Sequence, residues 1–426
     1  MKFTAGILNA YDHRNRGDRA IIEAQMAWIA RKMPGADFRI FSAAWKENTT
    51  AFGSHRSKRH PIRMAEEGGG WRSLAENLRP VCESLATAAT GWRKDGGSDF
   101  EECDAYFLCG GGYFYSSTAP FLSRQLWIHA GNSLLALKSG KPVLQFPQSW
   151  GPVTKSLDGW ICRKVAQDLR CITSRGLFST ALLKKWGYDE KVLEVPDVVL
   201  AMRHLRPDLV GSNPVGDGTL GISPIDFRFA RKRSRRDLDL YLGRLEEVAA
   251  EFRAQGGKGV ILFPQVVVPG SDEDLSVAED VARRLDRRGI SNQVLRNPGW
   301  EEYWQAIARP SAFLGSRMHA CIFSMVSGVP TIGLAYQPKF HALFRQLGFE
   351  SRCFDIEDFD PRAVGRLLAQ WGSDTKESRK EVLHAVAAVS RTVLSSLDRC
   401  WDLCGVSGKP PLTKTASSGM MRDLVV

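Results

Sequence analysis

A chain of 426 residues is longer than a single hydrophobic core usually serves, so we expect two domains of about 200 residues each. Its 43% hydrophobic and 25% charged residues are those of an ordinary globular protein, which excludes collagenous and low-complexity classes. The formal net charge of +11 suits nucleic acid, an anionic membrane surface or anionic small substrates, and does not choose among them.

The N-terminal sequence runs directly into a strand-like segment without a long apolar core, so we expect no signal peptide. The longest apolar stretch, 320–336, is interrupted by serine, glycine and proline and is shorter than the roughly 20 residues that a spanning helix needs. Nine cysteines at unrelated spacings fit buried thiols in a reducing compartment. We therefore expect a cytoplasmic protein, and no ligand spacing predicts a metal or a cofactor.

The chain opens with a predicted strand over 3–9, a polar loop over 11–17 and a helix behind Asp18. Gly17 has no side chain, so a ligand could approach the backbone there, and Asn15 and Asp18 flank it. A capped turn without a ligand explains this loop equally well.

A short strand is predicted over 38–41, followed by a variable insertion over 43–100 to which we assign no chemistry. A compact apolar strand over 105–109 then runs into three glycines. Their N–H groups could face a phosphate or a sugar hydroxyl, although the spacing is not that of a P-loop. These candidates are Gly110, Gly111 and Gly112.

Strands and helices alternate from there to the predicted strand at 192–195, which favours a parallel sheet covered on both faces. A predicted turn at 147–152 contains Gln148, and Arg175 follows directly after a strand. We expect both side chains at the edge where ligands bind in such sheets.

Residues 203–218 are rich in Pro, Gly and Asn and are the predicted linker, after which the alternation restarts. We therefore expect an α/β protein with two Rossmann-like domains facing a cleft, a GT-B-like arrangement. The N-terminal domain would span 1–202 and the C-terminal domain 219–404. The tail at 405–426 has no periodicity and is predicted to be disordered.

The segment 314–339 predicts a β-α-β unit with Arg317 and His319 in the first turn of its helix. Free N–H groups at such a turn suit an anion. A guanidinium grips a carboxylate or phosphate bidentately, and an imidazole can move protons near neutral pH. This pair is the strongest candidate for catalysis.

Taken in order, these motifs resemble the polysaccharide pyruvyltransferase family over most of 3–348. The set comprises Asn15-x-Gly17-Asp18, Gly110 to Gly112, the PQSWGP turn, Ser174-Arg175, Pro196-Asp197, Arg317-x-His319, Gly328-x-Pro330 and Tyr336-x-x-Lys339. The sequence differs from the family pattern at the start of the second half, where Ser223 to Asp226 stand in place of an expected basic residue. Arg228 is the candidate substitute.

The resemblance implies transfer of a carboxyethylidene group from phosphoenolpyruvate to two hydroxyls of a sugar, as a pyruvate ketal. The acceptor would be a surface polysaccharide, such as an exopolysaccharide, or its lipid-linked precursor. The family's Arg-x-His motif falls on Arg317 and His319. The donor would lie on the C-terminal domain and the acceptor on the N-terminal domain, and Tyr336 and Lys339 join the expected binding residues.

Two other functions compete with this one. A nucleotide-sugar-dependent glycosyltransferase would use the same architecture, and a non-catalytic protein could bind anions or nucleic acid. No aromatic and basic signature of a nucleic-acid module is present, so no nucleic-acid partner is expected. The positive charge favours an anionic donor and peripheral contact with the inner face of an anionic membrane.

Overall fold

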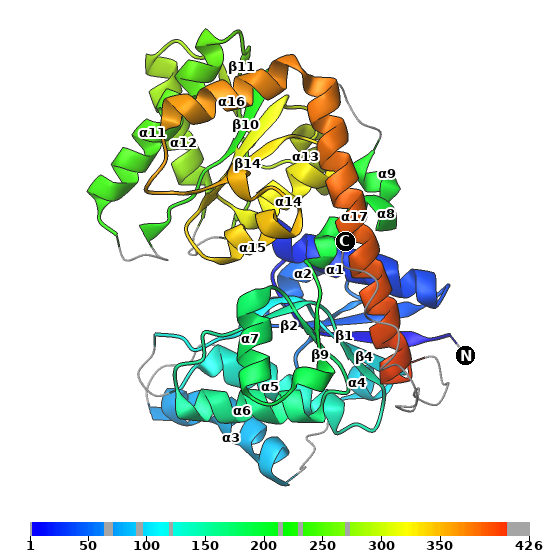
Figure 1. Ribbon diagram of the computed structural model, residues 1–426. Helices are drawn as coiled ribbons and strands as arrows, with labels where there is room; N and C mark the ends of the chain where they lie inside the picture. Colours follow the sequence, from blue (N-terminus) through cyan, green and yellow to red (C-terminus); the bar gives the residue numbers. More distant parts are fainter. Residues whose placement is uncertain are drawn as a thin grey trace.

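The computed structural model describes residues 2–63, 71–90 (backbone alone for 71–77 and 90), 97–118, 122–211, 216–228, 233–268 and 273–406. Two α/β lobes lie one above the other in Figure 1, and a long C-terminal helix runs along both. The predicted tail at 405–426 lies outside the described residues from 407 onward.

The first domain is built on parallel strands in the order β3-β2-β1-β4-β6 and β5-β7-β8-β9. These two sheets adjoin, because Phe146 N donates to Leu108 O (3.0 Å) and Gly111 N donates to Pro147 O (3.2 Å) where β4 passes into β5 and β6 into β7. The strands are β1 (Thr4–Ala10), β2 (Asp37–Ser42), β3 (Ser57–Arg59), β4 (Ala105–Leu108), β5 (Gly111–Phe114), β6 (Val143–Gln145), β7 (Gln148–Trp150), β8 (Ile172–Ser174) and β9 (Val192–Glu194).

Helices cover the faces of this sheet. They are α1 (Arg16–Lys32), α2 (Trp45–Phe52), α3 (Trp71–Thr90), α4 (Ser98–Glu101), α5 (Arg124–Leu137), α6 (Ser156–Asp168) and α7 (Leu177–Lys185), with 3₁₀ turns η1 (Asp189–Lys191) and η2 (Val198–Ala201). Asn15 caps α1 by accepting a hydrogen bond from Gly17 N.

The second domain has one parallel sheet in the order β12-β11-β10-β13-β14-β15, which is the dinucleotide-fold order. Its strands are β10 (Thr219–Ser223), β11 (Gly259–Leu262), β12 (Asn292–Val294), β13 (Ala312–Gly315), β14 (Thr331–Ala335) and β15 (Cys353–Asp355). Its helices are α11 (Arg235–Ala254), α12 (Leu275–Arg287), α13 (Trp300–Ile307), α14 (Met318–Val326), α15 (Lys339–Gln346), η3 (Glu350–Arg352) and α16 (Pro361–Ser373). The predicted fold of two Rossmann-like domains is confirmed.

Helix α17 (Thr375–Cys404) joins the two domains. At one end Arg379 donates to Ala308 O and Pro310 O of the second domain. At the other, Trp401 packs its ring 5.5 Å from Trp28 and 6.2 Å from Phe107 of the first domain. A single buried apolar cluster therefore extends through both domains.

Three local predictions need correction. The glycine triplet is not an open loop, because Gly111 and Gly112 begin β5; nor is 147–152 a simple turn, because it contains β7. The predicted linker includes two short helices, α8 (Met202–Leu205) and α9 (Pro207–Val210), which bury Leu205, Leu209 and Val210. Sequence patterns missed these elements because each is too short to show a period.

Candidate functional site

The two domains meet where the loop before α1 contacts the segment after β11. Arg16 N donates to Gln265 O (3.3 Å), and its guanidinium donates to Pro264 O (3.0 Å). Asn15 and Val266 form an antiparallel bridge beside them. Both segments follow the carboxyl ends of parallel strands, so these contacts hold the ligand-binding edges of the two sheets together.

Gly17 lies directly against the second domain. A Cβ atom placed there would lie 2.3 Å from Nδ1 of His319 and 3.0 Å from Nε2 of Gln265. In the structure, therefore, the missing side chain makes room for an imidazole from the other domain, rather than only for a ligand as the sequence suggested.

His319 projects from the first turn of α14 toward Asp197 of the first domain, and only 14% of its side chain is exposed. Its Nε2 lies 3.4 Å from Oδ2 of Asp197. Burial lowers the pKa of His319, and the Asp197 carboxylate opposes that effect. The predicted catalytic imidazole thus has a carboxylate beside it, as imidazoles that transfer protons often do.

Asp197 also joins Arg175 to this arrangement. Nη1 of Arg175 donates to Oδ2 of Asp197, Nε of Arg175 donates to Oγ of Ser149 (3.1 Å), and Val199 N donates to Oδ1 of Asp197 (3.0 Å). Although burial alone would raise the pKa of Asp197, Arg175 and His319 hold it well below its usual range. Asp197 is therefore an ionised residue that orients both the cation and the imidazole.

Arg317 is buried and bound to Asp274. Its Nε lies 3.0 Å from Oδ1 and its Nη2 2.6 Å from the same oxygen of a fully buried carboxylate. Oδ2 of Asp274 in turn accepts from Gln265 N (3.0 Å) and Val266 N (2.9 Å). In this structure Arg317 thus supports the segment that touches α1, while its predicted role in catalysis stays a prediction.

Asp18 and Lys339 come from opposite domains, and solvent reaches both side chains. Even so, surrounding protein raises the pKa of Asp18 to about 7, against the opposing charges of Arg175 and Lys339. The surrounding protein likewise lowers the pKa of Lys339 to about 8, helped by repulsion from Arg175 and Arg317. Within the described ranges neither group has a hydrogen bond or ion pair, and the ammonium lies 6.0 Å from the Tyr336 ring.

The other predicted residues lie at varying distances from this centre. A Cβ on Gly112 would lie 3.9 Å from Nη2 of Arg175, whereas Gly110 abuts Pro147 O and serves strand packing. The backbone carbonyl of Gln148 accepts a hydrogen bond from Arg175 N (2.8 Å), and Oε1 of its buried side chain has no hydrogen-bond partner among the described residues. Arg228 forms a partly exposed ion pair with Asp226 (2.6 Å).

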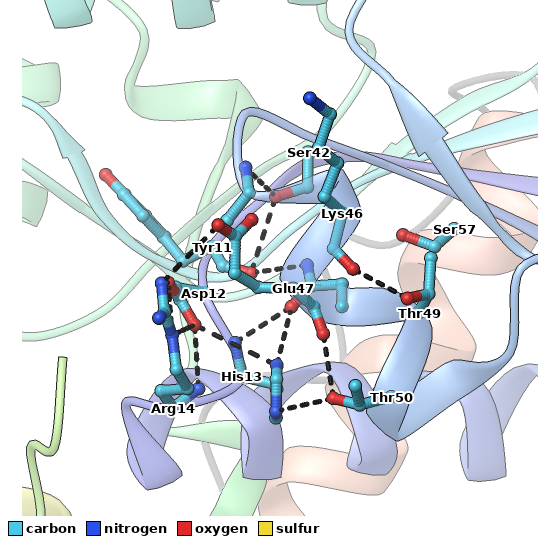
Figure 2. A network of polar contacts seen from close by, with 12 residues as sticks. Tyr11, Asp12, His13, Arg14, Ser42, Lys46, Glu47, Thr49, Thr50 and Ser57 are labelled. Carbon is cyan, nitrogen blue, oxygen red and sulfur yellow. Dashed lines mark hydrogen bonds and ion pairs between the residues drawn. The ribbon is translucent and has the colours of Figure 1, made fainter.

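The loop 11–14 is braced by part of the predicted insertion (Figure 2). Nδ2 of Asn48 in α2 donates to Tyr11 O (2.9 Å), and its Oδ1 accepts from His13 N (2.9 Å). Arg14 lies 3.8 Å from Glu47. Part of 43–100 therefore supports the loop that leads into Gly17 and Asp18, and Ser57–Arg59 forms the edge strand β3.

Sequence reasoning missed Asp274, Gln265 and Arg16, and it did not connect Asp197 with His319. The available signal was positional, because Arg16, Gln265 and Asp197 lie a few residues beyond the carboxyl end of a strand, whereas Asp274 directly precedes α12. No helix in the described ranges is long and apolar enough to cross a membrane. Within the same ranges, no group of three or more His, Cys, Asp and Glu residues is arranged to hold a metal ion.

Comparison with known proteins bears on both fold and family. A family model described as polysaccharide pyruvyl transferase matches residues 15–338. The amylovoran biosynthesis protein AmsJ of Erwinia amylovora is 21% identical over 274 residues, which cover 60% of this chain and 62% of that protein. The matched region therefore spans less than two thirds of that relative.

Solved structures share the architecture at low identity. A putative UDP-N-acetylglucosamine 2-epimerase from Listeria monocytogenes is 12% identical with a TM-score of 0.59, over 96% of this chain and 97% of that one. The S. aureus MnaA–UDP structure is 9% identical with a TM-score of 0.55, over 96% and 97% of the two chains. At such identities the likeness concerns the fold alone.

Proposed function

Because the chain belongs to the polysaccharide pyruvyl transferase family, we propose that it transfers a carboxyethylidene group from phosphoenolpyruvate to two hydroxyls of a saccharide, releasing phosphate. The saccharide would belong to a surface polysaccharide or its lipid-linked precursor. Donor binding would occur on the C-terminal domain, and the acceptor would lie against the N-terminal domain.

The observation that carries this proposal is the setting of His319. Its imidazole lies at the meeting edges of two parallel sheets, oriented by Asp197, with the charges of Arg175 and Lys339 close enough to depress its pKa. Phosphoenolpyruvate bears a carboxylate and a phosphate, which these cations would neutralise. Negative charge bound there would in turn favour the protonated imidazole, the form able to protonate the donor's methylene carbon.

Among the predicted cations, Lys339 of the C-terminal domain and Arg175, which would reach the donor from the N-terminal domain across the junction, support donor binding best. Arg175 presents a planar guanidinium fixed by Ser149 and Asp197, and Lys339 presents an ammonium without an ion pair in the described ranges. Arg317 would contribute indirectly, by holding Asp274 and the segment at 264–266 in place.

The test is to incubate the purified chain with phosphoenolpyruvate and a panel of oligosaccharides and lipid-linked saccharides. We expect phosphate release together with a mass gain of one carboxyethylidene group on an acceptor. His319→Asn should abolish both, whereas His341→Asn, an exposed histidine on α15, should not. Release of a nucleoside diphosphate from a sugar nucleotide, without phosphate from phosphoenolpyruvate, would favour a glycosyltransferase and overturn the proposal.

A further inference from the structure

We propose that Asp18 is the base that removes the proton from the attacking acceptor hydroxyl, and that the acceptor saccharide lies on the rings of Tyr11 and Tyr115. This inference rests on the proposed function. It assigns the acceptor half of the site to one carboxylate and one aromatic surface of the N-terminal domain.

Elimination among the nearby carboxylates points to Asp18. Asp197 is occupied by Arg175, His319 and Val199 N, and Asp274 by Arg317 and two backbone amides. Asp12 forms a bidentate pair with Arg14. Asp18 alone among these four has no hydrogen bond or ion pair to the described part of the chain, so its oxygens remain available to a ligand.

The position of Asp18 suits a base that works opposite an acid. It follows Gly17, where an added Cβ would lie 2.3 Å from Nδ1 of His319, so Asp18 belongs to the N-terminal domain and is the next residue after the glycine that borders the imidazole. Arg175 and Lys339 attract it, while Asp12 and Asp197 repel it. Surrounding protein raises the pKa of Asp18 to about 7, which makes this carboxylate a far better proton acceptor near neutrality than an ordinary aspartate.

The aromatic surface beside Asp18 has a fixed part and an open part. The Tyr11 ring packs 5.4 Å from the His129 ring and 6.3 Å from the Tyr113 ring. Its carbonyl is held by Asn48, and Figure 2 shows the phenol pointing away from the polar network around 12–14. Tyr115, which follows β5, is 49% exposed.

Tyr115 lies two residues beyond Tyr113, whose ring is 6.3 Å from the Tyr11 ring, and Tyr11 interacts electrostatically with both Asp18 and Tyr115. Tyrosine combines an apolar ring face with a polar tip, which suits the apolar face and the hydroxyls of a pyranose. An acceptor resting on these rings would bring its hydroxyls toward Asp18.

The chemistry balances with these groups. His319 gives its proton to the methylene carbon as the first hydroxyl oxygen bonds to the adjacent carbon, and Asp18 takes that hydroxyl's proton. The second hydroxyl oxygen then bonds to the same carbon as the carbon–oxygen bond to phosphate breaks. The second hydroxyl's proton restores His319, and the proton held by Asp18 leaves with the phosphate.

Asp18→Asn tests the base. We expect turnover to fall by about 10²- to 10⁴-fold, the usual contribution of a general base, with phosphoenolpyruvate affinity within about threefold of wild type. Glu23→Gln, on the same helix but paired with Arg19 and Arg206, should keep wild-type turnover. Turnover of Asp18→Asn within tenfold of wild type, or an equal loss in Glu23→Gln, would overturn the assignment.

Tyr115→Ala tests the surface. We expect the acceptor KM to rise about tenfold with donor KM unchanged, and Tyr115→Phe to retain most acceptor affinity because the ring face is kept. Leu240→Ala removes a similarly exposed side chain on α11 and should change neither KM. An unchanged acceptor KM in Tyr115→Ala would refute the proposal that the acceptor binds on these rings. Failure of the wild-type chain to turn over phosphoenolpyruvate would instead refute the proposed function.

Discussion

The ion pair between Arg317 and Asp274 allows a sharp test of what the arginine of the Arg-x-His motif does. We consider Arg317→Met, which keeps much of the side chain's volume and removes its charge. Asp274 would then be a fully buried carboxylate whose remaining partners among the described residues are the amides of Gln265 and Val266. Breaking a buried pair from one side typically costs about 3–5 kcal/mol, because the remaining charge stays desolvated.

For domains of roughly 200 residues, each kcal/mol lowers Tm by about 2–4 °C, so we expect a decrease of about 6–20 °C. Arg228→Met is the matched control, because its pair with Asp226 is partly exposed and worth no more than about 1 kcal/mol. The measurement is thermal unfolding by calorimetry, combined with equilibrium binding of phosphoenolpyruvate at a temperature where each variant is folded.

A double-mutant cycle with Asp274→Asn separates the pair from its surroundings. We expect the doubly substituted chain to lose less stability than the sum of the single losses, by about 0.5–3 kcal/mol, because neither charge is then left unpaired. If Arg317→Met melts within about 2 °C of wild type yet no longer binds the donor, Arg317 is a ligand group and does not support the segment at 264–266.

Three further predictions concern the junction between the domains. Gly17→Ala should abolish turnover and cost about 1–3 kcal/mol, since the new Cβ would overlap the His319 ring, whereas Gly243→Ala in open space on α11 should stabilise by about 0.5–1 kcal/mol. Equal Tm changes in the two variants would contradict this close contact. The pH profile of kcat/KM should rise through about pH 7 as Asp18 ionises and fall at higher pH as His319, whose pKa is lowered by burial, and Lys339 lose their protons, and Asp18→Asn should remove the acidic limb. An acidic limb that stays in place in the residual activity of that variant excludes Asp18 as the group that ionises there. Trp401→Ala should cost about 3–5 kcal/mol in denaturant titrations, because it empties the space between Trp28 and Phe107, and an unchanged midpoint would show that α17 is not anchored there.

Local patterns were sufficient to place the catalytic candidates on the correct elements. The β-α-β unit around Arg317 and His319 forms as predicted, with Arg317 at the N-cap of α14. The position of Arg175 directly after a strand correctly placed it at the ligand-binding edge, because parallel strands align their carboxyl ends, and Lys339, which was named from the family motif, lies near it. Short strands such as β5 and β7 were not predicted, because three or four residues show no recognisable periodicity.

The sequence by itself determined the fold class, the family resemblance and the kinds of group available for chemistry, since these depend on local periodicity and on ordered motifs. Only the tertiary structure decided which groups are free to act. Arg317 meets Asp274 across 43 positions of the chain, and His319 meets Asp197 from the other domain. The pKa values of Asp18 and Lys339 depend on how closely two domains surround them, and desolvation is a property of packing that no spacing of residues contains.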